Sequence, residues 1–316
     1  MSAPDRLPAS ILGGDPFNQF RFLYRWELLW KLFDERYCLS VMRAAYEAGG
    51  KAFDLSFDVN TRLMSKLIEE TGDQLIGFGN PTWEQGVILN GRFIQYSRDR
   101  ILRTLVDRLF PRNLARLVED KLSREDVLVF GYDRKAETLS DEEIESIYLD
   151  RGLFRKRLSI FKDCQYIFLG GSDADWLVPL GRTDILVDMA DIVRQEGFIP
   201  IILCQYATLV VPEAERAGVD TEGYAVPLNK EWSWFDRNEC VDIISSLDKP
   251  VIAFMPLASG KLREDVPGAL EWLYRDAGVE SILYGTATKI HAAETTRMAC
   301  EIRDIVNKTG SIHAAD

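Results

Sequence analysis

Short apolar runs alternate along the chain with longer segments of helical periodicity, and this alternation limits the fold more than any other feature. It predicts parallel strands joined by crossover helices. Eight is the number of strands at which a parallel sheet closes into a barrel, and eight runs lie at residues 9–14, 51–57, 74–79, 127–132, 165–171, 199–206, 251–256 and 281–285. The sequence therefore predicts an α/β protein whose residues 1–316 form a single (β/α)8 TIM barrel domain.

Two loops are longer than a barrel requires, and we expect both as insertions over its carboxyl end. After the third predicted strand, Asn90-Gly91 lies between two apolar runs, which is the strongest local signal for a two-residue hairpin turn. After the sixth, residues 207–234 are rich in proline, glycine and tryptophan. Because the loops after barrel strands form the active site, these insertions are either lids or packing without ligand contact. A helix is expected over 141–161, with Ser140 as its N-cap.

Composition narrows the classes of partner. Acidic side chains outnumber basic ones by 50 to 38, and the resulting net charge of −12 repels nucleic acid and anionic membranes, so a small-molecule substrate is predicted. The five cysteines are widely scattered, which predicts reduced thiols rather than disulfides or a zinc site. No apolar run approaches the roughly 20 residues that cross a bilayer, and we expect a soluble, cytoplasmic protein.

An aromatic stretch follows the first predicted strand, at residues 17–33. At helical spacing, Phe22, Trp26, Trp30 and Phe33 share one apolar side. This side either packs against the barrel wall or forms a subunit contact in a homo-oligomer, because exposed aromatic patches mark interfaces.

Four segments resemble the aldo-keto reductases, and they follow the order of that family. Residues 48–54 end in Phe53-Asp54, and residues 199–206 end in Gln205-Tyr206. Residues 251–260 contain a Pro-Leu-x-x-Gly turn, and residues 285–294 are similar to the phosphate and adenine segment. The resemblance implies an aldo-keto reductase barrel that binds a nicotinamide dinucleotide, NAD or NADP, and acts as an oxidoreductase.

The resemblance also implies which residues hold the cofactor: Ser172, Asp173, Gln205, Phe254, Leu257, Ser259, Gly260, Thr286, Thr288 and Glu294. The first three stand where the family binds the nicotinamide carboxamide, and Phe254 stands where an aromatic ring faces the nicotinamide. The others stand near the phosphates and the adenine. Independently of the family, small hydroxyl residues just before a helix suit a phosphate, and the alternative is that Gly285-Thr286 is simply a strand end and N-cap. His291 replaces the usual Arg, which weakens the case for NADP over NAD.

The resemblance implies four catalytic groups, of which Asp54 matches the strand-two Asp. Val59 stands in place of the proton-donating Tyr. The predicted third strand ends in Gly79-Asn80 without the Lys, and the fourth ends at Tyr132 without the His. Tyr132 is therefore the second catalytic candidate, either as a proton donor beside Asp54 or as a hydrogen bond that orients a ligand. Aspartates at several strand ends could hold a hard cation, but solvation explains them as well, and no metal site is predicted.

Three functions stay open, because fold alone does not decide function. The first is an oxidoreductase with a divergent active site and a non-standard proton donor. The second is a non-redox lyase or isomerase that acts on a phosphorylated or carboxylated small molecule. The third is a pseudoenzyme, a regulatory barrel that keeps the pocket without the chemistry.

Overall fold

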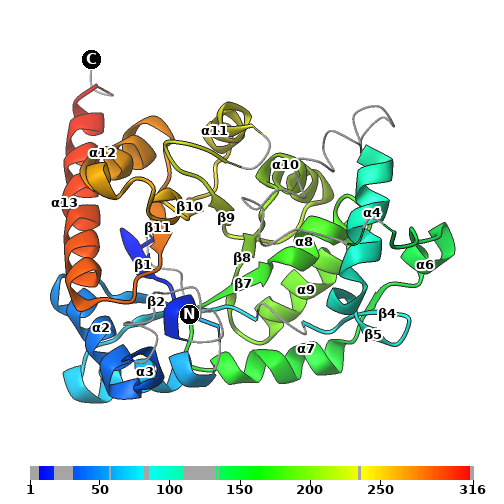
Figure 1. Ribbon diagram of the computed structural model, residues 1–316, viewed down its shortest axis with the longest axis horizontal. Helices are drawn as coiled ribbons and strands as arrows, with labels where there is room; N and C mark the ends of the chain where they lie inside the picture. Colours follow the sequence, from blue (N-terminus) through cyan, green and yellow to red (C-terminus); the bar gives the residue numbers. More distant parts are fainter. Residues whose placement is uncertain are drawn as a thin grey trace.

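The computed structural model describes residues 7–17, 31–56, 58–81, 85–109, 133, 135–233 and 236–313. Its centre is a closed barrel of parallel strands (Figure 1). In order around the ring, the strands are β1 (Ser10–Leu12), β2 (Ala52–Leu55), β3 (Ile76–Gly79), β7 (Tyr166–Gly170), β8 (Ile199–Leu203), β9 (Tyr224–Pro227), β10 (Val251–Phe254) and β11 (Ser281–Tyr284). The predicted (β/α)8 barrel is confirmed.

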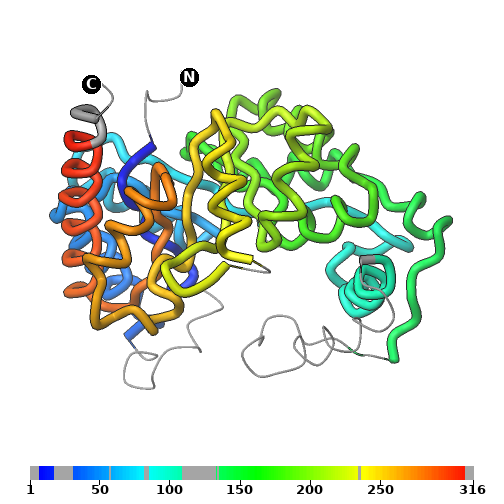
Figure 2. Tube along the Cα trace, turned by 90° about the horizontal axis from the view of Figure 1, so that it is seen from above, coloured from blue at the N-terminus to red at the C-terminus, as the bar shows by residue number. Residues whose placement is uncertain are grey.

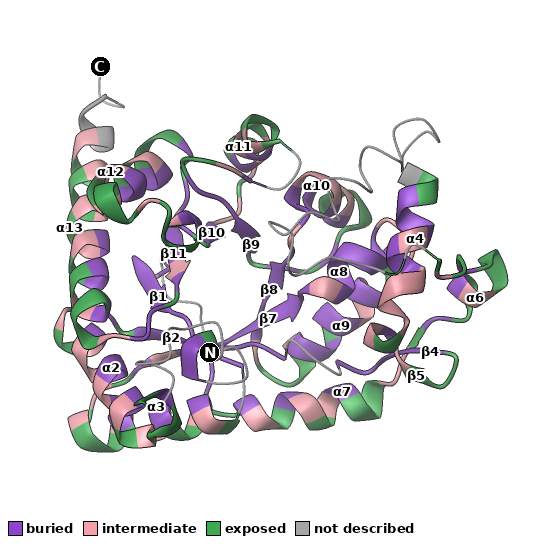
Figure 3. Cartoon of the chain, viewed as in Figure 1, coloured by how far each residue is buried: buried purple, intermediate pink, exposed green. Residues whose placement is uncertain are grey.

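Helices follow the strands and cover the outside of the ring. They are α2 (Glu35–Glu47), α3 (Asp58–Thr71), α8 (Ser172–Leu177), α9 (Thr183–Gln195), α10 (Ala207–Ala217), α11 (Arg237–Ser245), α12 (Val266–Glu271), which continues as a π turn over Trp272–Asp276, and α13 (Lys289–His313). The last helix, α13, packs along α2 and so brings the two ends of the ring together. Figure 3 shows buried and exposed faces along α13, as expected for a helix on a barrel wall.

Apolar side chains fill the inside of the barrel. Residues alternate between the interior and the helix-facing side, so that Ala52 and Phe78 point inward while Phe53 points toward the helices. Phe78 stacks on Tyr166, with ring centroids 4.6 Å apart, and on Phe168, at 5.2 Å. The interior is therefore a packed core, as in other barrels of this kind.

Seven of the eight predicted strands are confirmed, and one strand was missed. The predicted strand at 127–132 lies outside the described residues, and β3 pairs directly with β7 through Phe78 and Tyr166. The missed strand is β9, which pairs with β8 and β10. The prediction of an insertion over 207–234 is therefore wrong, because α10 and β9 form an ordinary helix and strand of the barrel.

The insertion after β3 is confirmed as a small antiparallel sheet outside the ring, made of β4 (Val87–Leu89), β5 (Arg92–Phe93) and β6 (Tyr148–Leu149). Asn90 and Gly91 both have left-handed backbones, with φ of 52° and 73°, as the predicted hairpin turn requires. The chain continues through η4 (Ile94–Ser97) and α4 (Arg98–Leu109). Figures 1 and 2 place α4 at the opposite end of the molecule from α13.

The helix expected over 141–161 is two helices, α6 (Asp141–Glu145) and α7 (Arg151–Leu158). The Ser140 cap is confirmed, since its hydroxyl accepts the Glu143 N–H and the Glu143 carboxylate accepts the Ser140 N–H. The helix breaks because β6 pairs with β4. Asp150 then caps α7 by accepting the Leu153 N–H at 3.0 Å.

Three smaller expectations have mixed outcomes. All five cysteines are free thiols and four of them are buried, so the absence of disulfides is confirmed. Within the described part of the chain, no helix has both the length and the apolar character that a membrane crossing needs. Of the aromatic stretch, residues 18–30 lie outside the described residues, while Phe17 is buried and Phe33 is 60% exposed.

Candidate functional site

Asp54 is a buried acid near the carboxyl end of β2. The alternation along β2 turns its side chain toward the inside of the barrel, where it is 4% exposed. The backbone N–H of Gly14, in the loop after β1, donates to Oδ2 at 3.2 Å. The other oxygen, Oδ1, is buried and has no hydrogen-bond partner among the described residues. One oxygen is thus held by the Gly14 N–H, and the other is enclosed by the protein without a hydrogen bond among the described residues.

The surroundings of Asp54 keep this acid protonated at far higher pH than usual. Burial, and next the neighbouring Asp15 carboxylate, raise its pKa, while hydrogen bonds from the Gly14 N–H and the Asn80 side chain lower it, and the net pKa is about 7. The position where the resemblance implies a lysine is Gly79 or Asn80, and neither residue carries the positive charge that would favour the ionised form of Asp54. A carboxylic acid with this pKa can release and recover a proton at neutral pH.

Asp173, in the first turn of α8, is the second buried acid. It is 1% exposed, and its Oδ1 accepts a hydrogen bond from Gln95 Nε2 in η4 at 2.7 Å. Burial raises its pKa, the Gln95 hydrogen bond lowers it and the Asp175 charge raises it, with a net pKa of about 8. Its Oδ2 is buried and has no partner in the described part of the chain. Asp173 therefore links α8 to the insertion that contains Gln95. The resemblance implies that Asp173 binds the nicotinamide, but its Oδ1 already accepts the Gln95 hydrogen bond.

Asp175, the third buried acid, holds the end of β8. Its carboxylate accepts the backbone N–H groups of Gln205, at 2.9 Å, and of Tyr206, at 2.8 Å. Burial raises the pKa of Asp175 and these two N–H groups lower it, with a net pKa of about 7. The half-buried side chains of Ser172 and Gln205 lie beside this anchor, at the rim of the barrel.

The loop after β10 has an unusual backbone. Met255, Ala258 and Ser259 have φ of 56°, 49° and 55°, and Gly260 has φ of 87°. Left-handed conformations are uncommon for residues other than glycine, and turns that contain them can direct several N–H groups to one side, as anion-binding loops do. Ser259 and Gly260 are exposed, while Leu257 is half-buried. This turn begins directly after Phe254, which lies inside the barrel at its rim.

The loop after β11 leads into the N-terminus of α13. The Thr286 hydroxyl accepts the Thr288 N–H at 3.3 Å, and the Thr288 hydroxyl accepts the His291 N–H at 3.2 Å. Thr288 therefore caps α13, whose N-terminus carries partial positive charge. Glu294 is exposed on the first turns of the helix. The predicted phosphate segment is thus a capped helix start at the barrel rim.

The ten residues predicted to hold a cofactor follow β7, β8, β10 and β11, so they lie at one end of the barrel. Their order around the rim differs from the expected one. Because β9 stands between β8 and β10, Gln205 and Phe254 are separated by a strand that the sequence reading did not include. Ser172 follows the strand next to β3, one place nearer to Asp54 than expected. Tyr132, the second predicted catalytic residue, lies outside the described residues.

Sequence reasoning missed the residues that surround the acids. Gly14 and Asn80 bond to Asp54, Asn60 bonds to Gly14, and Gln95 bonds to Asp173. Asn80 follows β3 directly and Gly14 lies two residues after β1, and the carboxyl ends of barrel strands are where functional side chains gather. Their position after a strand was therefore the sequence signal that could have identified these two residues. Asn60 and Gln95 carried no such signal.

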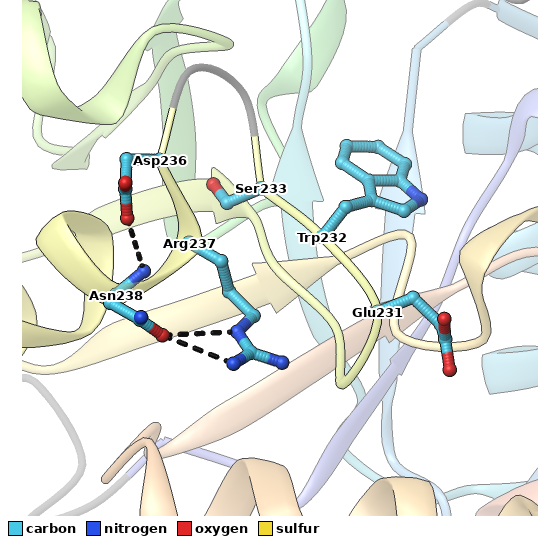
Figure 4. A pocket seen from close by; sticks show the side chains of 6 residues that line it. All are labelled: Glu231, Trp232, Ser233, Asp236, Arg237 and Asn238. Atoms are coloured by element: carbon cyan, nitrogen blue, oxygen red, sulfur yellow. Dashed lines mark hydrogen bonds between the residues drawn. The ribbon is translucent and has the colours of Figure 1, made fainter.

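A shallow pocket of about 370 Å³ lies after β9, lined by Glu231, Trp232, Ser233, Asp236, Arg237 and Asn238 (Figure 4). The Arg237 guanidinium donates to the Asn238 side-chain oxygen and to the Lys230 carbonyl, and it lies over the Trp272 ring at 5.4 Å. The pocket thus combines charges of both signs with one indole. Among the described residues, no group of three His, Cys, Asp or Glu could hold a metal ion.

No protein-family model matches the sequence, and no curated protein matches it. Solved structures do match the fold. Two of them, assigned as aldo-keto reductases from Pseudomonas aeruginosa, share 14% and 12% sequence identity with this chain. Each covers 93% of this chain and 90% of its own, with TM-scores of 0.52 and 0.53. At this identity the likeness concerns the fold, and this chain has the barrel fold of the aldo-keto reductases.

Proposed function

We propose that the protein is an oxidoreductase that binds NAD or NADP and reduces a carbonyl group of a small molecule, with Asp54 as the proton donor. The observation that carries this proposal is the Asp54 side chain itself. It is buried at the reacting end of the barrel, with a pKa of about 7 and one oxygen that has no partner among the described residues. The aldo-keto reductase fold supports the choice of cofactor.

The rim has features that fit a dinucleotide. The Ala258 and Gly260 N–H groups bond within the turn at residues 255–260, so the exposed Ser259 on this turn and the N-terminus of α13 would face the phosphates. Phe254 offers a flat apolar ring for the nicotinamide, and Ser172 and Gln205 would bind its carboxamide. The bound dinucleotide supplies the hydride that reduces the carbonyl carbon.

Asp54 supplies the proton that completes the reduction. As the carbonyl carbon gains the hydride, its oxygen takes the proton from Oδ1 of Asp54, and the product is an alcohol. Asp54 is left as a carboxylate, which the Gly14 N–H stabilises at Oδ2. It recovers its proton from solvent after the product leaves. An acid whose pKa is close to the working pH serves this cycle best.

Nucleotide binding is the first test. Trp176 in α8 and Trp232 in the pocket lie near the proposed rim, so tryptophan fluorescence should report binding. We expect a saturable change when NAD, NADH, NADP and NADPH are titrated separately, with at least one reduced form binding in the micromolar range. If none of the four binds, the proposal is refuted and the lyase or isomerase is favoured.

The second test is the Asp54→Asn variant, assayed over a panel of aldehydes and ketones. The amide keeps the shape and an acceptor for the Gly14 N–H but has no acidic proton. We expect kcat to fall by about 10²-fold or more, with nucleotide affinity unchanged. Asp191→Asn, an exposed carboxylate on α9, is the matched control and should keep full activity. Tight nucleotide binding without turnover in the wild type would indicate a regulatory barrel, and full activity in Asp54→Asn would exclude Asp54 as the donor.

A further inference from the structure

The loop after β1 is held in place by hydrogen bonds on several sides. Gly13 donates its N–H to the Tyr284 carbonyl in β11 at 2.8 Å. The Gly14 carbonyl accepts the Phe17 N–H and also Nδ2 of Asn60, both at 3.0 Å. Asn60 lies in the first turn of α3 and is 1% exposed. The Asn60 side chain on α3 therefore donates a hydrogen bond to the backbone of Gly14, and the N–H of Gly14 bonds to Asp54.

Packing leaves this arrangement little freedom. A Cβ added to Gly14 would lie 2.5 Å from Asn60 Nδ2 and 2.5 Å from the Asp54 carbonyl oxygen. Real Cβ atoms do not approach other atoms so closely, so there is no room for a side chain at Gly14, between Asp54 and Asn60. The chain of contacts runs from Asn60 Nδ2 to the Gly14 carbonyl, and from the Gly14 N–H to Oδ2 of Asp54.

This chain of contacts distinguishes the two oxygens of Asp54. The carbonyl oxygen of a carboxylic acid accepts a hydrogen bond better than its hydroxyl oxygen does, so the Gly14 N–H favours Oδ2 as the carbonyl oxygen. In the neutral acid the proton then lies on Oδ1, which is buried and has no partner within the described ranges. The geometry thus selects the oxygen that presents the proton.

We propose that Asn60 is a positioning residue. Its hydrogen bond to the Gly14 carbonyl fixes Gly14 so that the Gly14 N–H stays hydrogen-bonded to Oδ2 of Asp54. The transferable proton is then carried by Oδ1. This inference rests on the proposed function, because it needs Asp54 as the proton donor. Asn60 itself touches no substrate. It acts through Gly14, and its role is separate from the binding of a nucleotide.

Two neighbours should move the titration of Asp54 in opposite directions. In the part of the chain that the structure describes, the titratable groups that face it are Asp15 and the Cys164 thiol, whose own pKa lies far above neutral because of burial. The charge on Asp15 raises the pKa of Asp54, and the Gly14 N–H lowers it. Loosening Gly14 should therefore raise this pKa, and removing the Asp15 charge should lower it.

The test combines Asn60→Leu with Asp15→Asn. Leucine matches the size of asparagine and leaves the Gly14 carbonyl its bond from Phe17. The readout is the side-chain carboxyl of Asp54, followed by 13C NMR without nucleotide and assigned by its absence in Asp54→Asn. We expect the midpoint to rise by about one pH unit in Asn60→Leu and to fall in Asp15→Asn. In the reductase assay, the pH profile should move in parallel, and kcat of Asn60→Leu should fall about tenfold at unchanged KM for the nucleotide.

The outcomes separate this inference from the proposed function. An unchanged Asp54 midpoint in Asn60→Leu refutes the positioning role, whatever the activity. Shifted midpoints together with full activity in Asp54→Asn overturn the proposed function, and with it any part of Asn60 in catalysis. If Asn60→Leu does not fold, the test is the NMR chemical shift of the Gly14 amide in the wild type. If the Gly14 N–H bonds to Asp54, this shift must change with pH at the midpoint of Asp54. A shift that stays constant from about pH 5 to about pH 9 refutes the inference.

Discussion

Replacing Asp173 with asparagine should stabilise the protein at neutral pH. In the folded chain this acid lies on α8, faces Gln95 in η4 and is 1% exposed. Among the described residues, no cation contributes to its pKa. The asparagine side chain would keep the acceptor for Gln95 Nε2. Its new amide group could also donate to Gln95 Oε1, which is buried and lacks a partner in the described part of the chain.

The size of the effect follows from proton linkage. Burial raises the pKa of Asp173 to about 8, whereas an unfolded aspartic acid titrates near about 3.9. Between these pH values the folded chain binds the extra proton, so the contribution of Asp173 to stability falls as pH rises. At about 1.4 kcal/mol per pH unit, the cost at pH 7 is at most about 4 kcal/mol, and it vanishes near pH 4. The asparagine avoids this cost.

Urea unfolding of wild type and Asp173→Asn, measured at pH 4, 5.5 and 7, tests the reasoning. We expect the variant to be more stable by about 1 to 4 kcal/mol at pH 7 and equal to the wild type near pH 4. Asp191→Asn, on the exposed face of α9, should show no difference at any pH. A stability difference that does not depend on pH, or a variant less stable than the wild type at pH 7, would show that Asp173 is not a buried neutral acid.

Two further predictions concern the packing that supports the site. Gln85 exchanges two hydrogen bonds with the backbone of Gly170, at 2.7 and 3.3 Å, so Gln85→Ala should lower the free energy of unfolding by about 2 to 4 kcal/mol; a loss below about 0.5 kcal/mol in urea unfolding would contradict this. Phe78 stacks on Tyr166 and Phe168 inside the barrel, so Phe78→Leu should cost about 1 to 2 kcal/mol and lower the thermal midpoint. An unchanged midpoint would mean that the interior repacks freely.

Features that depend on neighbours in the chain could be predicted well from the sequence. The Asn90-Gly91 turn has the left-handed backbone that its residues favour, and Ser140 caps a helix through Glu143. Seven barrel strands lie where apolar runs predicted them. The turn and the cap are formed by residues adjacent in sequence, and each strand is marked by its own apolar run, although its pairing partners lie elsewhere in the chain.

The tertiary structure decided where local signals were weak or misleading. The four residues of β9, between Gly223 and the loop after Pro227, resemble part of a turn-rich loop. They form a strand because β8 and β10 on either side supply its hydrogen bonds. The helix expected over 141–161 breaks because β4 pairs with Tyr148 and Leu149. Pairing energy from distant segments outweighs local propensity in both places.

The same division holds for the site. The sequence by itself determined a barrel and marked Asp54 as an acid on its second strand. It did not contain the pKa of that acid, which depends on burial and on groups from other segments. Gly14 lies 40 residues from Asp54, and Asn60 lies 46 residues from Gly14. Only the closed ring brings these three together, because the carboxyl ends of its parallel strands meet at one rim, where water is excluded and the charge on a carboxylate becomes costly.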